Sequence, residues 1–195
     1  MSTLDFTEAK ARLLKILRSK SVFHGDFTLA SGAKSSYYID CRLTTLDSEG
    51  AALVGQVVYA LISRRASELN VKVTGVGGLT MGADPIALAT GMQSFRENPS
   101  APLQPFVVRK APKSHGQTKL IEGNFKAGDK VVVIDDVVTK GDSTIAAIEA
   151  VKREGGEVAF VAILVDRQQG GREKIEALGY SVVNAFTKDD LLTQE

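Results

Sequence analysis

The segment Val131-Val-Val-Ile-Asp-Asp-Val-Val-Thr-Lys-Gly-Asp-Ser-Thr144 joins a β-branched run, two adjacent carboxylates and a short loop of small and hydroxyl residues. The apolar run is typical of a buried parallel strand. Ser143 or Thr144 can cap a helix whose apolar face follows in Ile145 and Ile148. We therefore expect a strand, a loop and a helix, with the loop at the strand's carboxyl end, where open α/β sheets bind ligands.

The loop after this strand offers donors for a phosphate. Gly141 allows close approach of the backbone, and the helix start supplies N–H groups. Uncharged hydroxyl donors come from Thr139, Ser143 and Thr144. Asp135 and Asp136 would repel an anion unless they face sugar hydroxyls or a hydrated cation, which favours a phosphorylated sugar with Mg²⁺. The P-loop pattern Gly-x-x-x-x-Gly-Lys-Ser/Thr is absent from the sequence.

The same segment resembles the motif that binds 5-phosphoribosyl 1-diphosphate (PRPP) in type I phosphoribosyltransferases, from its Asp-Asp pair through Thr-x-Gly to the closing Ser-Thr. Lys140 and Asp142 depart from the family, in which small residues are common there, so Asp142 is expected to point away from the phosphate. The resemblance implies PRPP contacts from Asp135, Asp136, Val137, Val138, Thr139, Lys140, Gly141, Asp142, Ser143 and Thr144. The alternative is an ordinary buried strand with a capped helix and two solvent-facing acids.

Composition bounds the class of protein. The chain has 195 residues, 44% hydrophobic and 24% charged, as in an ordinary globular domain. Its net charge of +1 gives no general attraction to nucleic acid or to a membrane surface. Cys41 is the single cysteine, so an internal disulfide is impossible and a reducing compartment fits. We expect a cytoplasmic protein with neither a nucleic-acid nor a membrane partner.

The N-terminal part precedes the alternating pattern of strands and helices. Apolar residues between Asp5 and Lys20 have the spacing of one helical face, and Asp5 and Glu8 are placed as a capping box. Two short β-like runs around a Ser-Gly turn follow between Phe23 and Arg42. The sequence therefore predicts a helix and a hairpin ahead of the main sheet.

The hairpin segment resembles the N-terminal hood of orotate phosphoribosyltransferases. The resemblance implies that Tyr37 and Tyr38 help to cover the pyrimidine, since aromatic faces shield a flat base from water. Ala30 stands where some relatives have a substrate-contacting lysine, and Lys34 is a candidate to replace it. Alternatively, the two tyrosines simply alternate in a strand, one packing inward and the other facing solvent.

A second glycine-rich turn follows an earlier strand. The strand is expected at Val71 to Val76, ending in Gly77-Gly-Leu-Thr-Met-Gly-Ala-Asp84, with Pro85 opening a helix to about Gly91. By resemblance this turn is the family's diphosphate loop. Some relatives have a lysine in it; this chain has none, so cations must come from elsewhere. Taken alone, the glycines also fit a plain tight turn.

Positive charge is concentrated after the next strand. The residues from Arg109 to Lys119 include four Lys or Arg and no acid, in an order that resembles the catalytic loop of orotate phosphoribosyltransferases. The resemblance implies PRPP contacts from Arg109, Lys110, Lys113 and His115, with Lys113 or His115 as the proton donor to the departing diphosphate. A mobile loop that closes over substrate is expected, because irregular structure is favoured by Pro112, Gly116 and Gly123. The alternative is a solvated run of charge.

Further along, a buried strand from Glu157 to Val165 leads into Asp166-Arg-Gln. Relatives have an Asp-Arg-Gln segment here, which implies that the planar guanidinium of Arg167 holds the orotate carboxylate and ring oxygen. A surface pair between Arg167 and Asp166 is the alternative. Orotate contacts are thus expected from Lys34, Tyr37, Tyr38, Thr139 and Arg167. Other expected elements are helices from Asp47 or Ser48 to Ser67 and from Arg172 to Leu178, a strand from Tyr180 to Phe186, and a polar tail from Thr187 to Glu195.

The alternation of strands and helices predicts an α/β fold with a doubly wound, mainly parallel sheet and a small N-terminal hood. We expect one domain over residues 1–195, with the hood mainly in 1–45 and the core in about 46–187. The resemblance implies an orotate phosphoribosyltransferase that converts orotate and PRPP to orotidine 5′-monophosphate and diphosphate. It also implies a homodimer with shared active sites. The catalytic residues would be Lys113, His115, Asp135 and Asp136, with Mg²⁺ held through PRPP and water near the acid pair rather than by direct ligands. A phosphoribosyltransferase for another base and a PRPP-sensing regulator remain as alternatives.

Overall fold

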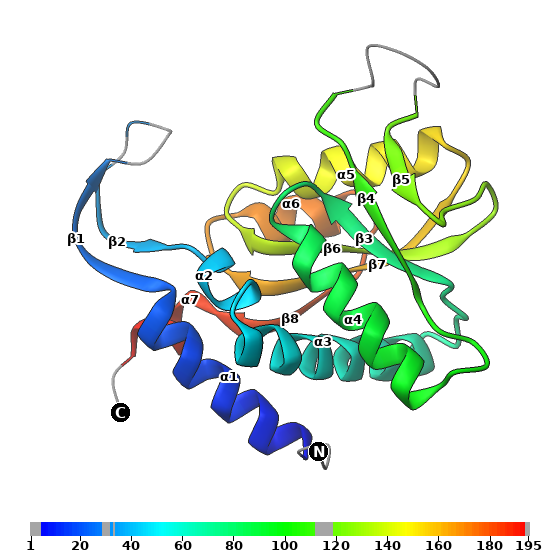
Figure 1. Ribbon diagram of the computed structural model, residues 1–195. Coiled ribbons are helices and arrows are strands. Elements are labelled where there is room, and N and C mark those ends of the chain that lie inside the picture. Colours follow the sequence, from blue (N-terminus) through cyan, green and yellow to red (C-terminus); the bar gives the residue numbers. More distant parts are fainter. Residues whose placement is uncertain (1–4, 29–31, 33, 112–118, 194–195) are drawn as a thin grey trace.

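A six-stranded sheet forms the centre of the computed structural model (Figure 1). The structure describes residues 5–28, 32, 34–111 and 119–193. The strand order is β5-β4-β3-β6-β7-β8, and every pairing is parallel except the antiparallel one between β4 and β5. Its strands are β3 (Gly75–Leu79), β4 (Gln104–Val108), β5 (Ile121–Gly123), β6 (Lys130–Val138), β7 (Glu157–Asp166) and β8 (Val182–Thr187). This confirms the predicted doubly wound, mainly parallel sheet.

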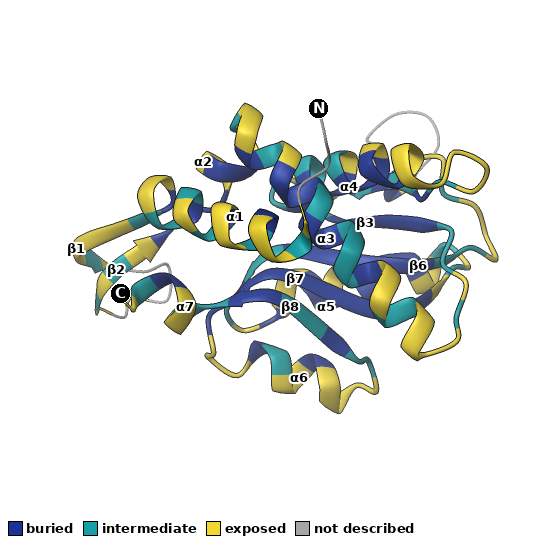
Figure 2. Cartoon of the chain, turned by 90° about the horizontal axis from the view of Figure 1, so that it is seen from below, coloured by how far each residue is buried: buried dark blue, intermediate teal, exposed yellow. Residues whose placement is uncertain are grey.

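Both faces of the sheet are buried, which explains why its strands are apolar at consecutive positions. Along β6, Val132 and Ile134 belong to one apolar layer, whereas Val131 and Val133 belong to the other. Figure 2 shows the buried strands between helices on either side. The helices are α1 (Phe6–Lys20), α2 (Arg42–Thr45), α3 (Ser48–Glu68), α4 (Ala83–Glu97), α5 (Asp142–Arg153), α6 (Gly171–Ala177) and α7 (Lys188–Leu192).

The topology creates one crevice at the carboxyl ends of the strands. From β3 the chain passes through α4 to β4 on one side, while β6, β7 and β8 continue on the other side of β3. The strand order therefore reverses between β3 and β6, and ligands of open α/β sheets bind at such a switch point. The turn after β3 and the loop after β6 both lie there.

The N-terminal hairpin consists of β1 (Val22–Thr28) and β2 (Lys34–Ile39) and extends away from the main sheet (Figure 1). It is antiparallel, with Phe23 opposite Tyr38 and His24 opposite Tyr37. The predicted pair of β-like runs is confirmed.

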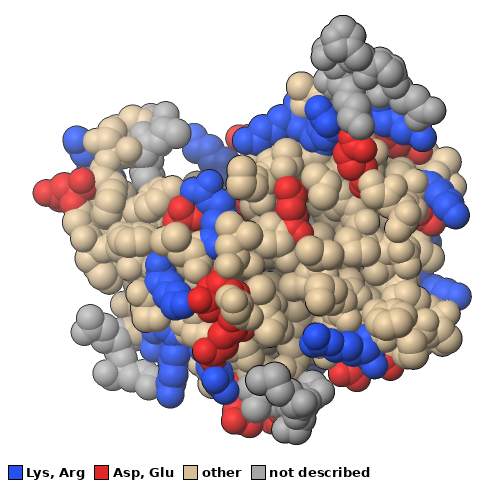
Figure 3. Space-filling model, in the orientation of Figure 1, with Lys and Arg blue, Asp and Glu red and all other residues tan. Residues whose placement is uncertain are grey.

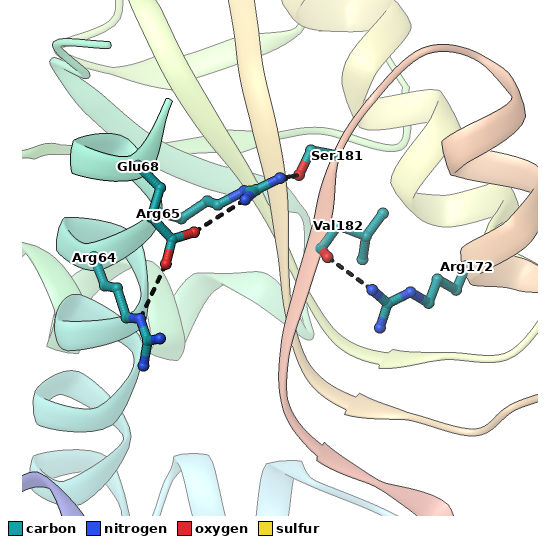
Figure 4. Close-up of polar contacts among 6 residues, drawn as sticks. All are labelled: Arg64, Arg65, Glu68, Arg172, Ser181 and Val182. Carbon is teal, nitrogen blue, oxygen red and sulfur yellow. Dashed lines mark hydrogen bonds and ion pairs between the residues drawn. The ribbon is translucent and has the colours of Figure 1, made fainter. Parts of the chain in front are cut away.

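Polar contacts fix both ends of α3. At its start, the Asp47 carboxylate accepts a hydrogen bond from the Gly50 N–H at 2.9 Å, as the sequence predicts. Near its end, Arg65 donates from Nε to the hydroxyl of Ser181, the residue before β8, at 3.0 Å (Figure 4). Arg64 and Arg65 also pair with Glu68. Among the described residues, no helix has the length and apolar character that crossing a bilayer requires.

Two of the predicted helix caps are wrong. Asp5 precedes α1, but its side chain makes no capping hydrogen bond, so the expected box with Glu8 is not formed. Neither Ser143 nor Thr144 caps α5, because that helix already begins at Asp142 after a left-handed Gly141. A capping box occurs instead at the start of α7, between Thr187 and Asp190, in the stretch expected to be a polar tail.

The strand before the glycine-rich turn also differs from its prediction. It begins at Gly75 and runs through Gly77 and Gly78, which were expected in the turn. A Cβ atom at Gly77 would lie 2.1 Å from the Phe106 carbonyl oxygen, so glycine at this position allows β4 to pack closely against β3. For the same reason α4 continues past Gly91, which packs against Pro105 instead of ending the helix.

Candidate active site

A large cavity, about 1040 Å³, lies between the hairpin strand β2 and the carboxyl ends of β6 and β7. A second pocket of about 300 Å³ adjoins it on the side of β3 and shares Asp135, Tyr38 and Ser143 with it. Asp136 lines the second pocket only. Together they give an elongated site at the switch point of the sheet, with the two acids near its middle.

One end of the site is the loop from Thr139 to Ser143, which lines the large cavity. Gly141 has φ +78°, and a Cβ atom there would lie 2.9 Å from the Gly171 carbonyl oxygen. The Gly171 N–H donates to the Thr139 carbonyl at 3.1 Å, so the start of α6 supports the loop from below. Because α5 begins directly after Gly141, its N-terminal N–H groups provide an anion-binding position.

Asp142, which stands where the family commonly has a small residue, forms an ion pair in the structure. Its carboxylate pairs with Lys174 of α6 at 2.6 Å, and this contact lowers the pKa of Asp142. Lys174 thus offsets a negative charge at the edge of the predicted phosphate loop. Asp142 also lines the large cavity, so its direction relative to a phosphate stays a prediction.

The two adjacent acids differ in their surroundings. Asp135 is buried, and its carboxylate accepts hydrogen bonds from the Thr144 hydroxyl at 2.6 Å and the Asp136 N–H at 3.1 Å. Burial raises the pKa of Asp135 to about 7 and also raises the pKa of Asp136. Burial thus disfavours the charged form of both acids, and a nearby cation would favour it. Thr144 is itself buried and lies beneath the loop, bonded to Asp135, rather than in the cavity lining.

The turn after β3 lies directly against the acid pair. A Cβ atom at Gly82 would stand 2.3 Å from Asp136 Oδ1, so only glycine allows this approach without displacement. Thr80, Met81 and Gly82 line the second pocket, and the Thr80–Met81 peptide bond is cis. The glycine-rich turn and the acid pair, about fifty residues apart in sequence, thus form one site.

At the other end of the large cavity, Arg167 is 7% exposed. Its Nε and Nη2 atoms are buried and have no hydrogen-bond partner within the described parts of the chain. Its guanidinium lies 5.3 Å from the ring centroid of Tyr37. The expected alternative, a pair with Asp166, is not formed: Asp166 accepts the Gln168 N–H at 2.8 Å. Buried unpartnered donors that border a cavity suit a planar acceptor such as a carboxylate.

The predicted hood residues also border this cavity. Tyr37 is half-buried, whereas Tyr38 is 38% exposed and its ring lies 5.8 Å from that of Phe27. Their burial alternates as in a simple strand, yet both side chains line the large cavity. Lys34 also lines it and donates to the Thr28 hydroxyl at 2.9 Å.

The basic segment is described only in part. Arg109 pairs with Glu122 at 3.3 Å, and Lys110 lines the second pocket. Lys113 and His115 lie outside the described residues, so their roles stay predictions. Ile121–Gly123 forms the edge strand β5, a short element that the sequence did not predict.

The acid pair suits a magnesium ion that a ligand brings with it. The residues that the structure describes include no group of three or more His, Cys, Asp or Glu placed to hold a metal. Mg²⁺ commonly binds through one or two carboxylates, water and substrate phosphates, so two acids beside a predicted phosphate loop are a fitting donor set.

Sequence reasoning assigned no role to Arg42, although it lines the second pocket at the start of α2. The available signal was its place at the end of the predicted hairpin segment. That signal is weak, because only the fold brings Arg42 toward the turn after β3.

Comparisons with known proteins agree with this geometry. A family model described as "Phosphoribosyl transferase domain" matches residues 88–188. The orotate phosphoribosyltransferase of Aquifex aeolicus is 43% identical over 185 residues, covering 95% of this chain and 97% of the relative. The crystal structure of the Mycobacterium tuberculosis orotate phosphoribosyltransferase with Fe(III) dicitrate is similar with a TM-score of 0.79 and 39% identity, covering 95% of this chain and 99% of that one.

A second structure of the M. tuberculosis enzyme contains PRPP. It is similar with a TM-score of 0.72 and 31% identity, covering 98% of each chain. Similarity at this level extends across both the hairpin and the main sheet. The chain therefore belongs to the orotate phosphoribosyltransferase family.

Proposed function

We propose that this protein transfers the 5-phosphoribosyl group of PRPP to orotate, giving orotidine 5′-monophosphate and diphosphate in pyrimidine synthesis. The observation that carries the choice of base is Arg167, whose buried unpartnered nitrogens border the large cavity beside Tyr37. An orotate carboxylate satisfies those donors, whereas uracil, adenine and hypoxanthine lack a carboxylate.

In this proposal the substrates span the elongated site. The 5-phosphate occupies the loop from Thr139 to Ser143, at the start of α5. The ribose lies over Asp135 and Asp136, and the diphosphate extends into the second pocket. The orotate ring lies in the large cavity, near Tyr37, Tyr38, Lys34, Thr139 and Arg167.

The chemistry needs no covalent enzyme intermediate. As the bond from ribose C1 to the diphosphate oxygen breaks, positive charge grows on the sugar and negative charge on the leaving group. A ring nitrogen of orotate forms the new bond to C1 and gives up its proton. Asp135 and Asp136 hold the ribose hydroxyls and provide a negative field beside the developing cation. Bound Mg²⁺ would neutralise part of the diphosphate charge. Arg109, Lys110, Lys113 and His115 stabilise the leaving anion, and Lys113 or His115 delivers a proton to it.

Base selectivity tests this proposal. Purified protein with PRPP and Mg²⁺ is supplied with orotate, uracil, adenine or hypoxanthine in parallel, and loss of each base is followed by absorbance. Loss of orotate alone is expected. Faster loss of another base would mean a different phosphoribosyltransferase, and loss of none would favour a PRPP-sensing regulator.

We also propose that residues 1–195 form one phosphoribosyltransferase domain.

We propose in addition that the protein is a homodimer. Support for the dimer comes from α4, whose inward face is buried while its outward face exposes Leu88, Met92 and Phe95, each more than half exposed. Figure 3 shows that the surface over α4 is largely uncharged. A helix that is apolar on both faces is typical of one covered by further protein, and a second copy can pair this face with its own. Substituting Phe95 by Glu should yield monomers in sedimentation, whereas dimers that persist unchanged would place the interface elsewhere.

The proposed dimer has shared active sites, in which Lys113 of one subunit serves the acid pair of the other. Asp136→Asn and Lys113→Ala are each expected to be nearly inactive alone. After subunit exchange, each mixed dimer would contain one intact site, so an equal mixture should regain about a quarter of wild-type activity. A mixture that stays inactive, although mass spectrometry shows mixed dimers, would place Lys113 in its own subunit's site.

A cytoplasmic location completes the proposal. Its support is Cys41, the chain's single cysteine, which is a fully buried free thiol suited to a reducing compartment. Burial raises the pKa of this thiol, which disfavours its reactive thiolate.

A further inference from the structure

The second pocket has acids and few cations, although it is the proposed place of a highly charged leaving group. Its carboxylates are Asp40, Asp135 and Asp136. In the described part of the chain, its cationic side chains are Arg42 and Lys110. The glycine-rich turn from Leu79 to Gly82 contributes backbone and Thr80 but no charge. An anion in this pocket therefore depends on cations from other elements.

Arg42 has the geometry of an oriented anion-binding group. Its Nε donates to Asp40 Oδ1 at 2.8 Å and its Nη2 donates to Asp40 Oδ2 at 2.7 Å. The Arg42 backbone N–H also donates to Asp40 Oδ1, at 3.1 Å. A side-chain guanidinium has five N–H donors, so three are left without a partner among the residues that the structure describes. The two bonds to Asp40 fix the plane of the guanidinium and leave the N–H groups on its other edge available to an anion.

Stability alone is a poor explanation for this arrangement. The Arg42 side chain is 45% exposed, and an exposed ion pair contributes little to folding. The pair also lies where the hairpin joins the core, between the end of β2 and the start of α2. At that position Arg42 lines the second pocket together with the turn after β3 and Lys110.

We propose that Arg42 binds the diphosphate group of PRPP, with Asp40 as its positioning residue. The inference rests on the proposed function and deepens it, because it assigns a cation to the leaving-group end of the site. Arg42 supplies the positive charge that the turn from Leu79 to Gly82 lacks. Its free donors face an anion that becomes more negative as the glycosidic bond breaks, so the contact strengthens along the reaction.

Two ligands that each fill one end of the site provide the test. Binding of inorganic diphosphate and of ribose 5-phosphate, both with Mg²⁺, is measured by calorimetry on the full-length wild type and on Arg42→Gln, Arg42→Lys and Arg64→Gln. Arg64 is the matched control, since it is an exposed arginine paired with Glu68 on α3 (Figure 4). Its substitution removes the same charge from a residue that lines neither the large cavity nor the second pocket.

Arg42→Gln should weaken diphosphate binding by about 10- to 100-fold, as expected for a charge-assisted hydrogen bond, and change ribose 5-phosphate binding by less than about twofold. Arg42→Lys should lose less, because it keeps the charge without the fork, and Arg64→Gln should change neither ligand. Unchanged diphosphate affinity in Arg42→Gln, or equal losses for both ligands, would overturn the assignment. If Arg42→Gln does not fold, a wild-type-like diphosphate affinity in both Arg42→Lys and Asp40→Asn would also overturn it. Orotate turnover by the wild type is measured separately, so the Arg42 assignment can fail while the proposed function stands.

Discussion

Substituting Arg167 by Met should make the ligand-free protein more stable and the base site weaker. Met keeps an unbranched apolar stem but removes the Nε and Nη2 donors, which are buried and unpartnered in the described chain. Each such donor costs about 1–3 kcal/mol of desolvation in the free protein. The contact with the Tyr37 ring, which the substitution also removes, is worth about 0.5–2 kcal/mol. The two donors together cost about 2–6 kcal/mol, so after subtracting the ring contact we expect a net gain of about 1.5–4 kcal/mol in the free energy of unfolding.

The same substitution removes the proposed partner of the orotate carboxylate. A charge-assisted hydrogen bond contributes about 1.5–3 kcal/mol, which corresponds to a 10- to 150-fold loss of affinity. Calorimetry with orotidine 5′-monophosphate and with ribose 5-phosphate isolates this effect, because the two ligands differ by the orotate ring. Only the first should bind more weakly.

Arg172→Met is the matched control. Each nitrogen of the Arg172 guanidinium donates a hydrogen bond: Nε to Glu176 at 2.9 Å, Nη1 to Asn184 at 2.7 Å and Nη2 to the Val182 carbonyl at 3.1 Å. Figure 4 shows the contact with Val182. Its loss should destabilise the protein in urea and leave both ligands unaffected. If Arg167→Met proves as destabilising as Arg172→Met, or weakens both ligands alike, Arg167 is a structural residue and the reasoning fails.

Three further predictions concern the acid pair, the glycine turn beside it and the proposed phosphate loop. Because burial raises the pKa of Asp135 from 3.8 to about 7, the folded protein binds more protons than the unfolded chain between those values, and the stability of the free protein falls as pH rises from about 4 to 7. Asp135→Asn should therefore stabilise the free protein more at pH 8 than at pH 4, by on the order of 3 kcal/mol, and equal urea midpoint shifts would contradict this. Gly82→Ala should lower turnover more than tenfold, because its methyl group displaces the Asp136 carboxylate, while the melting temperature stays near that of wild type. Normal turnover would mean that the turn shifts to accommodate the methyl group and leaves Asp136 in place. Lys174→Ala should weaken ribose 5-phosphate binding by about two- to fivefold by leaving Asp142 unpaired, and the double variant with Asp142→Ala should recover it, which calorimetry can check.

The sequence predicts best the elements whose signals are local or purely apolar. The run from Val131 to Ile134 is apolar at every position, so its place in the buried centre of a parallel sheet follows from pattern alone. The start of α3 at Ser48 is equally local, because the Asp47 carboxylate reaches an N–H three residues on. In the site, the loop after β6 could be proposed because it directly follows a predicted strand. Arg167 could be proposed only because Asp166-Arg-Gln resembles a segment of the relatives.

Features that depend on distant contacts were missed. Gly77 and Gly91 resemble turn and helix-end signals, yet they are required by the approach of Phe106 and Pro105 from β4. Thr144 resembles a cap, but the fold turns its hydroxyl toward Asp135. Arg42 belongs to the site only because α2 lies beside the turn after β3, and no spacing in the sequence encodes that proximity.

The proposed reaction is tested most directly by identifying and counting its products. Purified protein is incubated with orotate, PRPP and Mg²⁺, and mass spectrometry follows all reactants while a coupled assay measures diphosphate. The account predicts that orotidine 5′-monophosphate and diphosphate appear in equal amounts, matching the orotate consumed. Diphosphate release without orotidine 5′-monophosphate, or no consumption of orotate by protein that binds PRPP, would contradict it.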